Sequence, residues 1–210
     1  ATRILRFDIP SKTFTGEFVF GFEKAAVVDA KSTKNSDLKR SALVALDNDT
    51  LLVQERTDNA FLLSTIKIKD SANILKTKWD LAATTPSLET YSGSGTNAEV
   101  EALIATTEKM IVFKSTDIST MPMKIEGIAV IDANHIVVVN DNDFSFAYNT
   151  TTSKVDVGTT KTSILTIKLA APLPITPESS LAQYGRKCVT AGATGNGLTC
   201  STSGDQLRWK

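Results

Sequence analysis

The stretch Ser41-Ala-Leu-Val-Ala-Leu-Asp-Asn-Asp-Thr-Leu-Leu-Val-Gln-Glu-Arg56 decides the fold class of this chain. Two apolar runs flank a short Asp/Asn turn, which is the pattern of two β-strands joined by a tight connection. The second run leads directly into the charged residues Glu55 and Arg56. The stretch therefore predicts an antiparallel hairpin whose buried second strand ends in a polar cluster.

A second segment, residues 128–143, has the same plan. In both segments, eight positions separate the turn aspartate from the polar residue that ends the second strand, Asp47 to Glu55 and Asp132 to Asn140. Hairpins repeated radially form the inner part of propeller blades and aim their polar clusters at one channel. The alternative is that any two β-hairpins look alike at this level of detail.

Short β-type runs also fill the rest of the first 170 residues, and few helical patterns interrupt them. The chain is thus predicted to be all-β, with repeated antiparallel sheets of the β-propeller type. One helix is predicted over residues 98–107, and residues 91–97 and 149–162 are interpreted as loops. The predicted strands are Arg3–Ile9, Glu17–Phe22, Leu43–Leu46, Leu51–Gln54, Leu62–Lys69, Met110–Lys114, Ile128–Ile131, Ile136–Asn140 and Ile164–Leu169.

Composition excludes several classes of protein. Lys and Arg (23) balance Asp and Glu (23), so the total charge gives no reason to expect a nucleic-acid partner. No apolar run approaches the roughly 18–20 residues of a membrane span. A serine-histidine-aspartate hydrolase is not indicated, since the only histidine, His135, lies in a predicted turn and no GxSxG motif is present.

The pattern predicts three parts: a propeller portion over residues 1–172, a proline-rich linker over 173–178 and a tail over 179–210. Both cysteines, Cys188 and Cys200, lie in the tail. Their spacing favours a local disulfide over a metal or redox site, with two free thiols as the alternative. Such a bond contributes on the order of 3 kcal/mol in the chain-entropy model. It implies an oxidising compartment, so we predict a secreted, extracellular protein.

Two motifs carry a family resemblance. The segment ending Leu51-Leu-Val-Gln-Glu-Arg56 resembles the "LLVLER" segment of the bacterial phytase-like family, labelled "esterase-like activity of phytase". Ile125-Glu-Gly-Ile-Ala129, followed by Val139-Asn-Asp-Asn-Asp-Phe144, resembles its later "EGIA … NDNDF" segment. The resemblance covers roughly residues 1–170. It implies a secreted β-propeller that hydrolyses small phosphorylated or ester substrates.

The resemblance also predicts a partial ring. Domains of this family are usually considerably longer, and the matched motifs belong to their second half. A part of a ring exposes strand edges and apolar faces. We therefore expect a second polypeptide, self-association or a missing segment to complete the ring. The tail is similar to the "C…G.T…G..L.C…L.W" tails of actinobacterial extracellular proteins, and a surface- or partner-binding tag is an equal interpretation of it.

The polar cluster after the second repeat is a candidate metal site. Glu126, Asn140, Asp141 and Asp143 carry carboxylate and amide oxygens, which are the ligands that Ca²⁺ prefers. We expect these residues to lie where a buried strand opens toward the channel. The alternative is a solvated turn, because Asn and Asp hydrogen-bond locally in turns.

Glu55 and Arg56 form the second candidate. A glutamate in this place can bind metal or act as general acid or base, and an arginine can clamp phosphate. The alternative is an ordinary ion pair at a strand end. Glu23 and Asp37 are secondary candidates, since both adjoin predicted strands.

Two function classes follow from these patterns. The first is a metal-dependent hydrolase of phosphoesters or related esters, in which Glu55, Arg56 and Glu126 act on a substrate polarised by calcium. The second is a non-catalytic secreted module that binds a protein, glycan or cell-wall partner and holds calcium only for structure.

Overall fold

The computed structural model describes residues 1–81, 83–84, 87–90, 97–175 and 187–210. The chain divides into two compact units, Ala1–Leu173 and Pro174–Lys210, which are described separately. Parts of the predicted loop 91–97, of the linker 173–178 and of the tail 179–210 fall outside the described residues.

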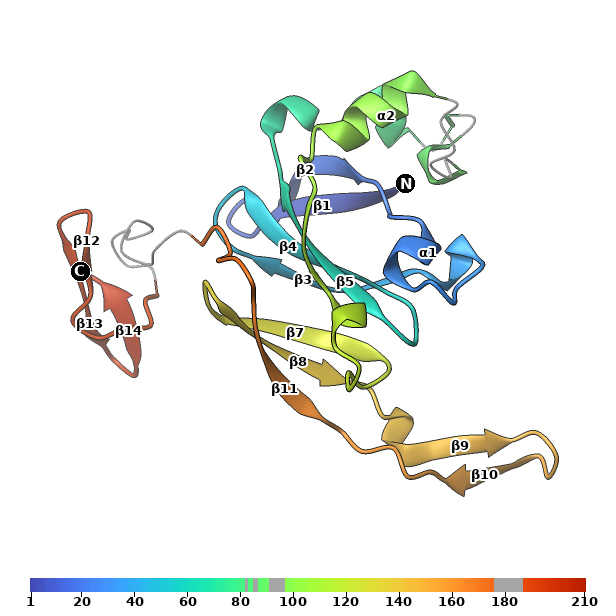
Figure 1. Cartoon of the computed structure of the whole chain (residues 1–210). Coiled ribbons are helices and arrows are strands. Elements are labelled where there is room, and N and C mark those ends of the chain that lie inside the picture. The colour runs from blue at the N-terminus through green and yellow to red at the C-terminus, as the bar shows by residue number, and fades with distance from the viewer. Residues whose placement is uncertain (82, 85–86, 91–96, 176–186) are drawn as a thin grey trace. The chain divides into compact units, whose positions relative to one another are not determined.

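The described residues are mainly β-strands (Figure 1). The α-helices are α1 (Ala25–Val28) and α2 (Ala98–Ala105), and single 3₁₀ turns lie at Asn35–Asp37, Asp70–Ala72, Lys78–Asp80, Leu88–Thr90, Ser115–Asp117 and Asp143–Ser145. The strands of the first unit are β1 (Thr2–Asp8), β2 (Thr13–Phe20), β3 (Lys39–Ala45), β4 (Thr50–Arg56), β5 (Phe61–Lys67), β6 (Met110–Lys114), β7 (Ile125–Asp132), β8 (His135–Asn140), β9 (Phe146–Asn149), β10 (Lys154–Val157) and β11 (Ile164–Lys168).

A four-stranded antiparallel meander, in the order β3-β4-β5-β6, forms the centre of the first unit. Its inner strands β4 and β5 are buried along almost their whole length, whereas β3 and β6 are more exposed. Apolar residues account for part of this burial, but Gln54, Glu55 and Arg56 of β4 are buried as well. All nine predicted strands are confirmed within a few residues at their ends.

The central sheet lies between two others (Figure 1). On one face Val53 and Ile66 pack against Phe18 and Phe20 of the β1–β2 hairpin. On the other face the Gln54 side chain donates a hydrogen bond of 2.7 Å to a backbone carbonyl at the start of β7, in the sheet β11-β8-β7. Antiparallel sheets packed face to face are the arrangement of neighbouring propeller blades, so the predicted fold class is confirmed.

The two predicted hairpins are structural repeats. In each, the turn aspartate accepts a hydrogen bond from the backbone two residues later, Asp47 at 2.8 Å and Asp132 at 2.7 Å. An ion pair also recurs with the same spacing along the chain, because Lys39–Asp58 in the first repeat corresponds to Lys124–Asp143 in the second. This recurrence of side-chain contacts favours a true repeat over a chance likeness of hairpins.

One loop prediction is wrong. Residues 149–162 contain strand β10, which pairs with β9 in a two-stranded hairpin inserted between β8 and β11. Thr- and Ser-rich stretches are typical of loops, and only Val155 and Val157 marked the strand in the sequence. The hairpin is closed at its base by a hydrogen bond from Gly158 N to Ser145 O.

The segment between β5 and β6 covers the outer face of the β1–β2 hairpin. Trp79 and Val100 from this segment pack against Val19 of β2. The predicted helix is confirmed as α2, which begins where the side chain of Asn97 accepts hydrogen bonds from the backbone of Glu99 and Val100. Such capping satisfies backbone donors that have no partner within the helix.

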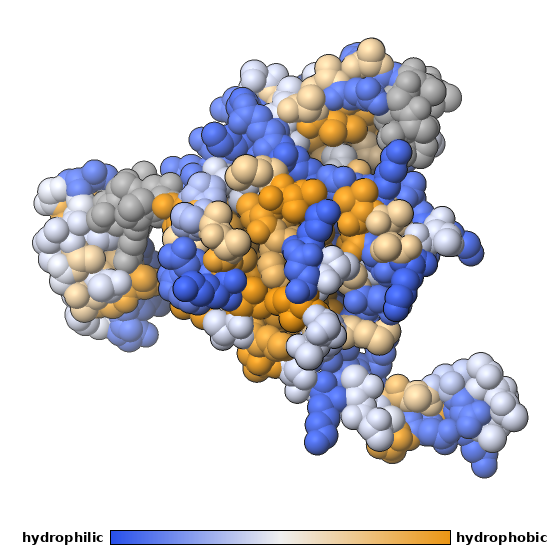
Figure 2. Space-filling view, in the orientation of Figure 1, coloured by the Kyte–Doolittle hydropathy of each residue, from blue (hydrophilic) through white to orange (hydrophobic). Residues whose placement is uncertain are grey.

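Large apolar side chains remain at the surface of the first unit. Figure 2 shows them over the central sheets and on the β9–β10 hairpin. On the hairpin Phe146 and Tyr148 lie across from Val157 and Val155, so one face of it is apolar and exposed. Exposed apolar surface is what a partial ring was expected to show.

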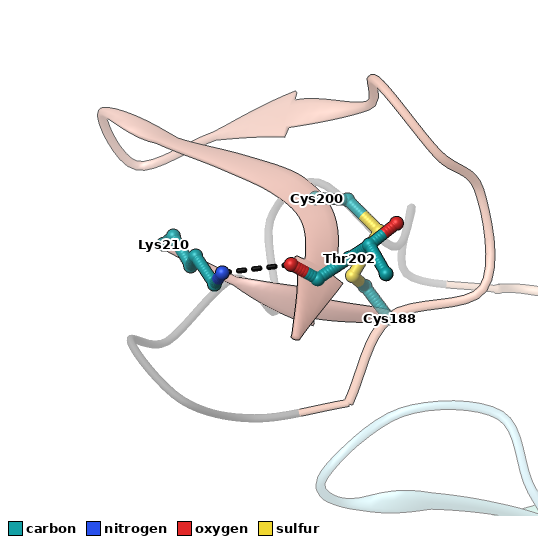
Figure 3. The surroundings of a disulfide bond; sticks show 4 residues. All are labelled: Cys188, Cys200, Thr202 and Lys210. Carbon is teal, nitrogen blue, oxygen red and sulfur yellow. Dashed lines mark hydrogen bonds between the residues drawn. A yellow bond between two sulfur atoms is a disulfide. The ribbon is translucent and has the colours of Figure 1, made fainter. Parts of the chain in front are cut away.

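The second unit is a small disulfide-closed sheet. Strands β12 (Thr194–Gly195), β13 (Leu198–Ser203) and β14 (Gln206–Trp209) form a three-stranded antiparallel sheet. Cys188 and Cys200 are bonded, and Trp209 packs beside them with 1% of its surface exposed. Lys210 Nζ donates a hydrogen bond of 2.7 Å to the backbone oxygen of Thr202 (Figure 3). The described part of the chain contains no helix long and apolar enough for a membrane span.

Candidate active site

Strand β4 separates the two motif residues that the sequence placed together. Successive side chains of a strand point to opposite faces of the sheet, so Glu55 and Arg56 cannot reach one site. Their cross-strand neighbours Arg40 and Lys39 are divided in the same way. The predicted Glu–Arg pair is therefore split between two clusters, called here the Glu55 cluster (Glu23, Arg40, Glu55, Lys109) and the Arg56 cluster (Lys39, Arg56, Asp58, Glu126).

The Glu55 cluster is built around one buried carboxylate. Glu55 has no exposed surface. Its Oε1 accepts a hydrogen bond of 2.7 Å from the backbone N of Glu23, and its Oε2 lies 2.5 Å from Lys109 Nζ. The same ammonium group lies 3.0 Å from Oε1 of Glu23 and donates 3.2 Å to the carbonyl of Gly21. Lys109 is thus held between two carboxylates.

Burial changes the proton affinity of this cluster. Loss of water raises the pKa of Glu55 above its ordinary value, and the attraction of Lys109 offsets only part of that effect. Aromatic rings surround the cations, since Lys109 Nζ lies 4.8 Å from the ring centre of Phe20 and the Arg40 guanidinium 4.8 Å from that of Phe22. Burial also lowers the pKa of Arg40.

An open pocket of about 570 Å³ adjoins the Glu55 cluster. Its volume falls within the range of small-molecule sites. Glu23 and Lys109 both line it, so the ion pair is accessible from the pocket while Glu55 stays buried behind it. The other lining residues are Ala1, Gly21, Phe22, Lys24, Asn35, Leu38, Glu89, Glu101, Ile104 and Ala105.

The Arg56 cluster joins the first repeat to the second. Arg56 is buried, and its Nε donates 2.6 Å to Ser41 Oγ while Nη1 lies 3.1 Å from Asp58 Oδ1. Its Nη2 pairs with Glu126, so two predicted site residues do meet. A hydrogen bond from Lys39 lowers the pKa of Asp58, against a smaller effect of burial. Arg56 is therefore fully engaged within the protein.

A second, smaller pocket of about 290 Å³ lies beside Asp58. The secondary candidate Asp37 lines it and accepts a hydrogen bond of 2.9 Å from Ser32 Oγ. Asp29 also lines it; burial acts to raise the pKa of Asp29, but hydrogen bonds from the Lys31 backbone, Asn59 and Thr57 outweigh it, so that pKa is lowered. Every carboxylate oxygen of Asp29 is thus engaged by the protein itself.

The residues proposed for calcium hold the chain in place instead. Asn140 is buried, and its side chain binds the backbone of the segment that precedes β11. It accepts a hydrogen bond of 2.6 Å from Ser163 N and donates one of 3.2 Å to Lys161 O. Asp141 accepts 2.9 Å from Asp143 N, and Asp143 pairs with Lys124. Within the described ranges no three His, Cys, Asp or Glu side chains form a metal-ligating group. These residues do not fit a calcium ion as arranged, and no step below uses one.

Comparison with known proteins decides the family. A family model described as "Phytase-like: Esterase-like activity of phytase" matches residues 1–144. The chain belongs to the phytase-like family. No curated protein and no solved structure matches it significantly. The matched range includes both clusters of this phytase-like chain and ends where the β9–β10 hairpin begins. Family membership supports a hydrolase-type function in general.

Two site residues of the phytase-like chain were missed by sequence reasoning. Lys109 and Arg40 complete the Glu55 cluster, yet neither belongs to a motif. Lys109 directly precedes β6, as Glu23 follows β2, so a polar residue at a strand end was the only available signal. The contact between Lys109 and Glu55 could not be predicted because the two residues are far apart in the sequence.

Proposed function

We propose that this phytase-like chain hydrolyses small esters in the 570 Å³ pocket. The observation that carries the proposal is the ion pair of Glu23 and Lys109, 3.0 Å apart, on the pocket wall. A carboxylate and an ammonium group side by side can supply a general base and a cation for developing negative charge.

The roles follow from geometry. The carboxylate of Glu23 takes a proton from water as the water oxygen attacks the ester. The ammonium group of Lys109 faces the oxygen that becomes negative in the transition state. Glu55 is a positioning residue, because it holds the Lys109 ammonium at 2.5 Å and the Glu23 backbone at 2.7 Å without reaching the pocket itself. A fixed arrangement of this kind needs little reorganisation during reaction.

Secretion is part of the proposal. The Cys188–Cys200 disulfide is consistent with an extracellular protein, because such bonds persist in oxidising compartments.

A non-catalytic binding module is the second candidate. The exposed apolar face of the β9–β10 hairpin favours it, together with Phe144 at the hairpin base, which is 87% exposed. Exposed apolar patches of this kind mark contact surfaces for partners, including a second polypeptide or a second copy.

Steady-state hydrolysis of chromogenic carboxylic and phosphate esters by the full chain tests the proposal. We expect Glu23→Gln to lower kcat/KM by about 10²–10⁴-fold, the usual contribution of a general base. Glu126→Gln is the matched control for Glu23→Gln, because Glu126 of β7 pairs with Arg56 on the side of β4 away from the pocket. It should retain activity within about threefold, since it removes only a half-exposed ion pair. Loss of activity in Glu126→Gln with none in Glu23→Gln would move the site to the Arg56 cluster.

An inactive wild-type chain would reject the hydrolase and leave the binding module. The same assays with added calcium and with a chelator test the calcium prediction. Circular dichroism of each variant shows that the fold is retained.

A further inference from the structure

The charges around the pocket set its substrate class. Lys109 is shared by Glu55 and Glu23, and Arg3, next to the pocket, pairs with Glu17 and Glu89. These cations are already neutralised by the protein. A bound anion would therefore compete with carboxylates for each of them.

Two charged side chains of the pocket remain without an ionic partner among the described residues. They are Lys24 and Glu101, and both lie on the lining. Three glutamates and two lysines line the pocket, so its walls carry no excess of positive charge. Phosphate sites instead gather several Arg or Lys groups or backbone donors around the oxygens. A phosphoryl dianion here would meet the Glu23 carboxylate, and Lys24 is the one lysine of the described lining that is not held by a carboxylate.

The apolar part of the lining points to a different group. Phe22, Leu38, Ile104 and Ala105 line the same pocket as the ion pair. Phe22 is only about one-third exposed and is held edge-on against Phe20, at 5.9 Å between ring centres. An apolar acyl or alcohol group gains by leaving water against such a wall.

We propose that the pocket takes neutral carboxylic esters with an apolar acyl group, and not phosphomonoesters or inositol polyphosphates. This inference rests on the ester hydrolysis proposed above and specifies its substrate. Water adds to the acyl carbon and gives one proton to Glu23, which thereby loses its negative charge. Lys109 then has one carboxylate partner fewer and faces the carbonyl oxygen that has become negative. The bond from the acyl carbon to the alcohol oxygen then breaks, and the proton on Glu23 passes to that oxygen. The products are one carboxylic acid and one alcohol.

The test compares four substrates with the full wild-type chain: p-nitrophenyl butyrate, p-nitrophenyl acetate, p-nitrophenyl phosphate and phytate. We expect butyrate to exceed acetate in kcat/KM by at least about tenfold, because added methylenes bind the apolar wall. Both phosphates should be hydrolysed at least about a hundredfold more slowly than butyrate, since a site lacking the partners of a charged group rejects it strongly.

Glu101→Lys provides an independent measurement on an exposed helical position. It adds a cation to the pocket and should raise the ratio of phosphate to acetate hydrolysis by about tenfold over that of the wild type. An unchanged ratio of phosphate to acetate would contradict the charge argument.

The outcomes separate the two proposals. Hydrolysis of phosphate esters in preference to butyrate, abolished by Glu23→Gln, would overturn the substrate class and keep the ester hydrolase. Absence of hydrolysis for all four substrates would overturn both.

Discussion

Two ion pairs of the first unit, one in the Glu55 cluster and one in the second repeat, differ in how deeply they are buried. In the Glu55 cluster the carboxylate has no exposed surface and its lysine partner, Lys109, is 15% exposed. In the second repeat the Lys124–Asp143 pair is 33% and 51% exposed. Burial makes the first cluster chemically unusual, because a buried charge depends on its partner, whereas water can replace the partner of an exposed one.

The largest expected effect comes from removing one cation on each side of this comparison. Lys109→Met leaves the Glu55 carboxylate buried without its ammonium partner and should cost about 3 kcal/mol of unfolding free energy. Lys124→Met removes an exposed pair and should cost less than about 1 kcal/mol. Urea denaturation of both variants checks the difference. Equal costs would mean that Glu55 is no more dependent on its partner than Asp143.

An intermediate effect is expected at Asn140, which occupies the position of Glu55 in the second repeat. Asn140→Ala leaves the N–H of Ser163 and the carbonyl of Lys161 without their side-chain partner, at a cost of about 1–3 kcal/mol. Asn140→Asp keeps the acceptor for Ser163 and should recover part of that loss. Thermal unfolding of the two variants measures it. If Asn140→Ala unfolds like the wild type, then Asn140 is not the structural counterpart of Glu55.

The smallest effect is the pH dependence of stability. The pKa of Glu55 is raised in the folded protein, so the folded state binds more protons than the unfolded state above the ordinary value of 4.5. The contribution of Glu55 is fully present below pH 4.5 and is lost as pH rises through its folded pKa. The free energy of unfolding of Glu55→Gln minus that of the wild type should therefore increase with pH in this window.

Asp58, in the Arg56 cluster, should give a pH dependence of stability opposite in sign to that of Glu55. Its pKa is lowered, so its contribution is present above the ordinary value of 3.8 and is lost as pH falls through its folded pKa. The wild type therefore loses this part of its stability in acid, whereas Asp58→Asn does not. The free energy of unfolding of Asp58→Asn minus that of the wild type should thus increase as pH falls below 3.8. The same direction of pH dependence for both variants would remove the contrast between the clusters.

The strands and the repeat were predictable because they depend on local patterns. Apolar runs bounded by Asp and Asn turns predict hairpins wherever they occur, and turn aspartates such as Asp47 and Asp132 cap those turns through contacts two residues away. The β9–β10 hairpin was not predicted because its few apolar residues are interspersed with Thr and Ser. The site was predicted only in part, since Glu55, Arg56 and Glu126 were named but assigned to one cluster.

The sequence by itself determined that the phytase-like chain is built of antiparallel hairpins with polar residues at their strand ends and a disulfide unit at its C-terminus. Only the tertiary structure decided which polar residues meet. Lys109 reaches Glu55 because α2 and the segment around it fold over the β1–β2 hairpin. Arg56 reaches Glu126 because the sheet β11-β8-β7 packs on the opposite face of β4. Local periodicity fixes the face on which a side chain lies, whereas contacts between distant segments depend on how the sheets pack.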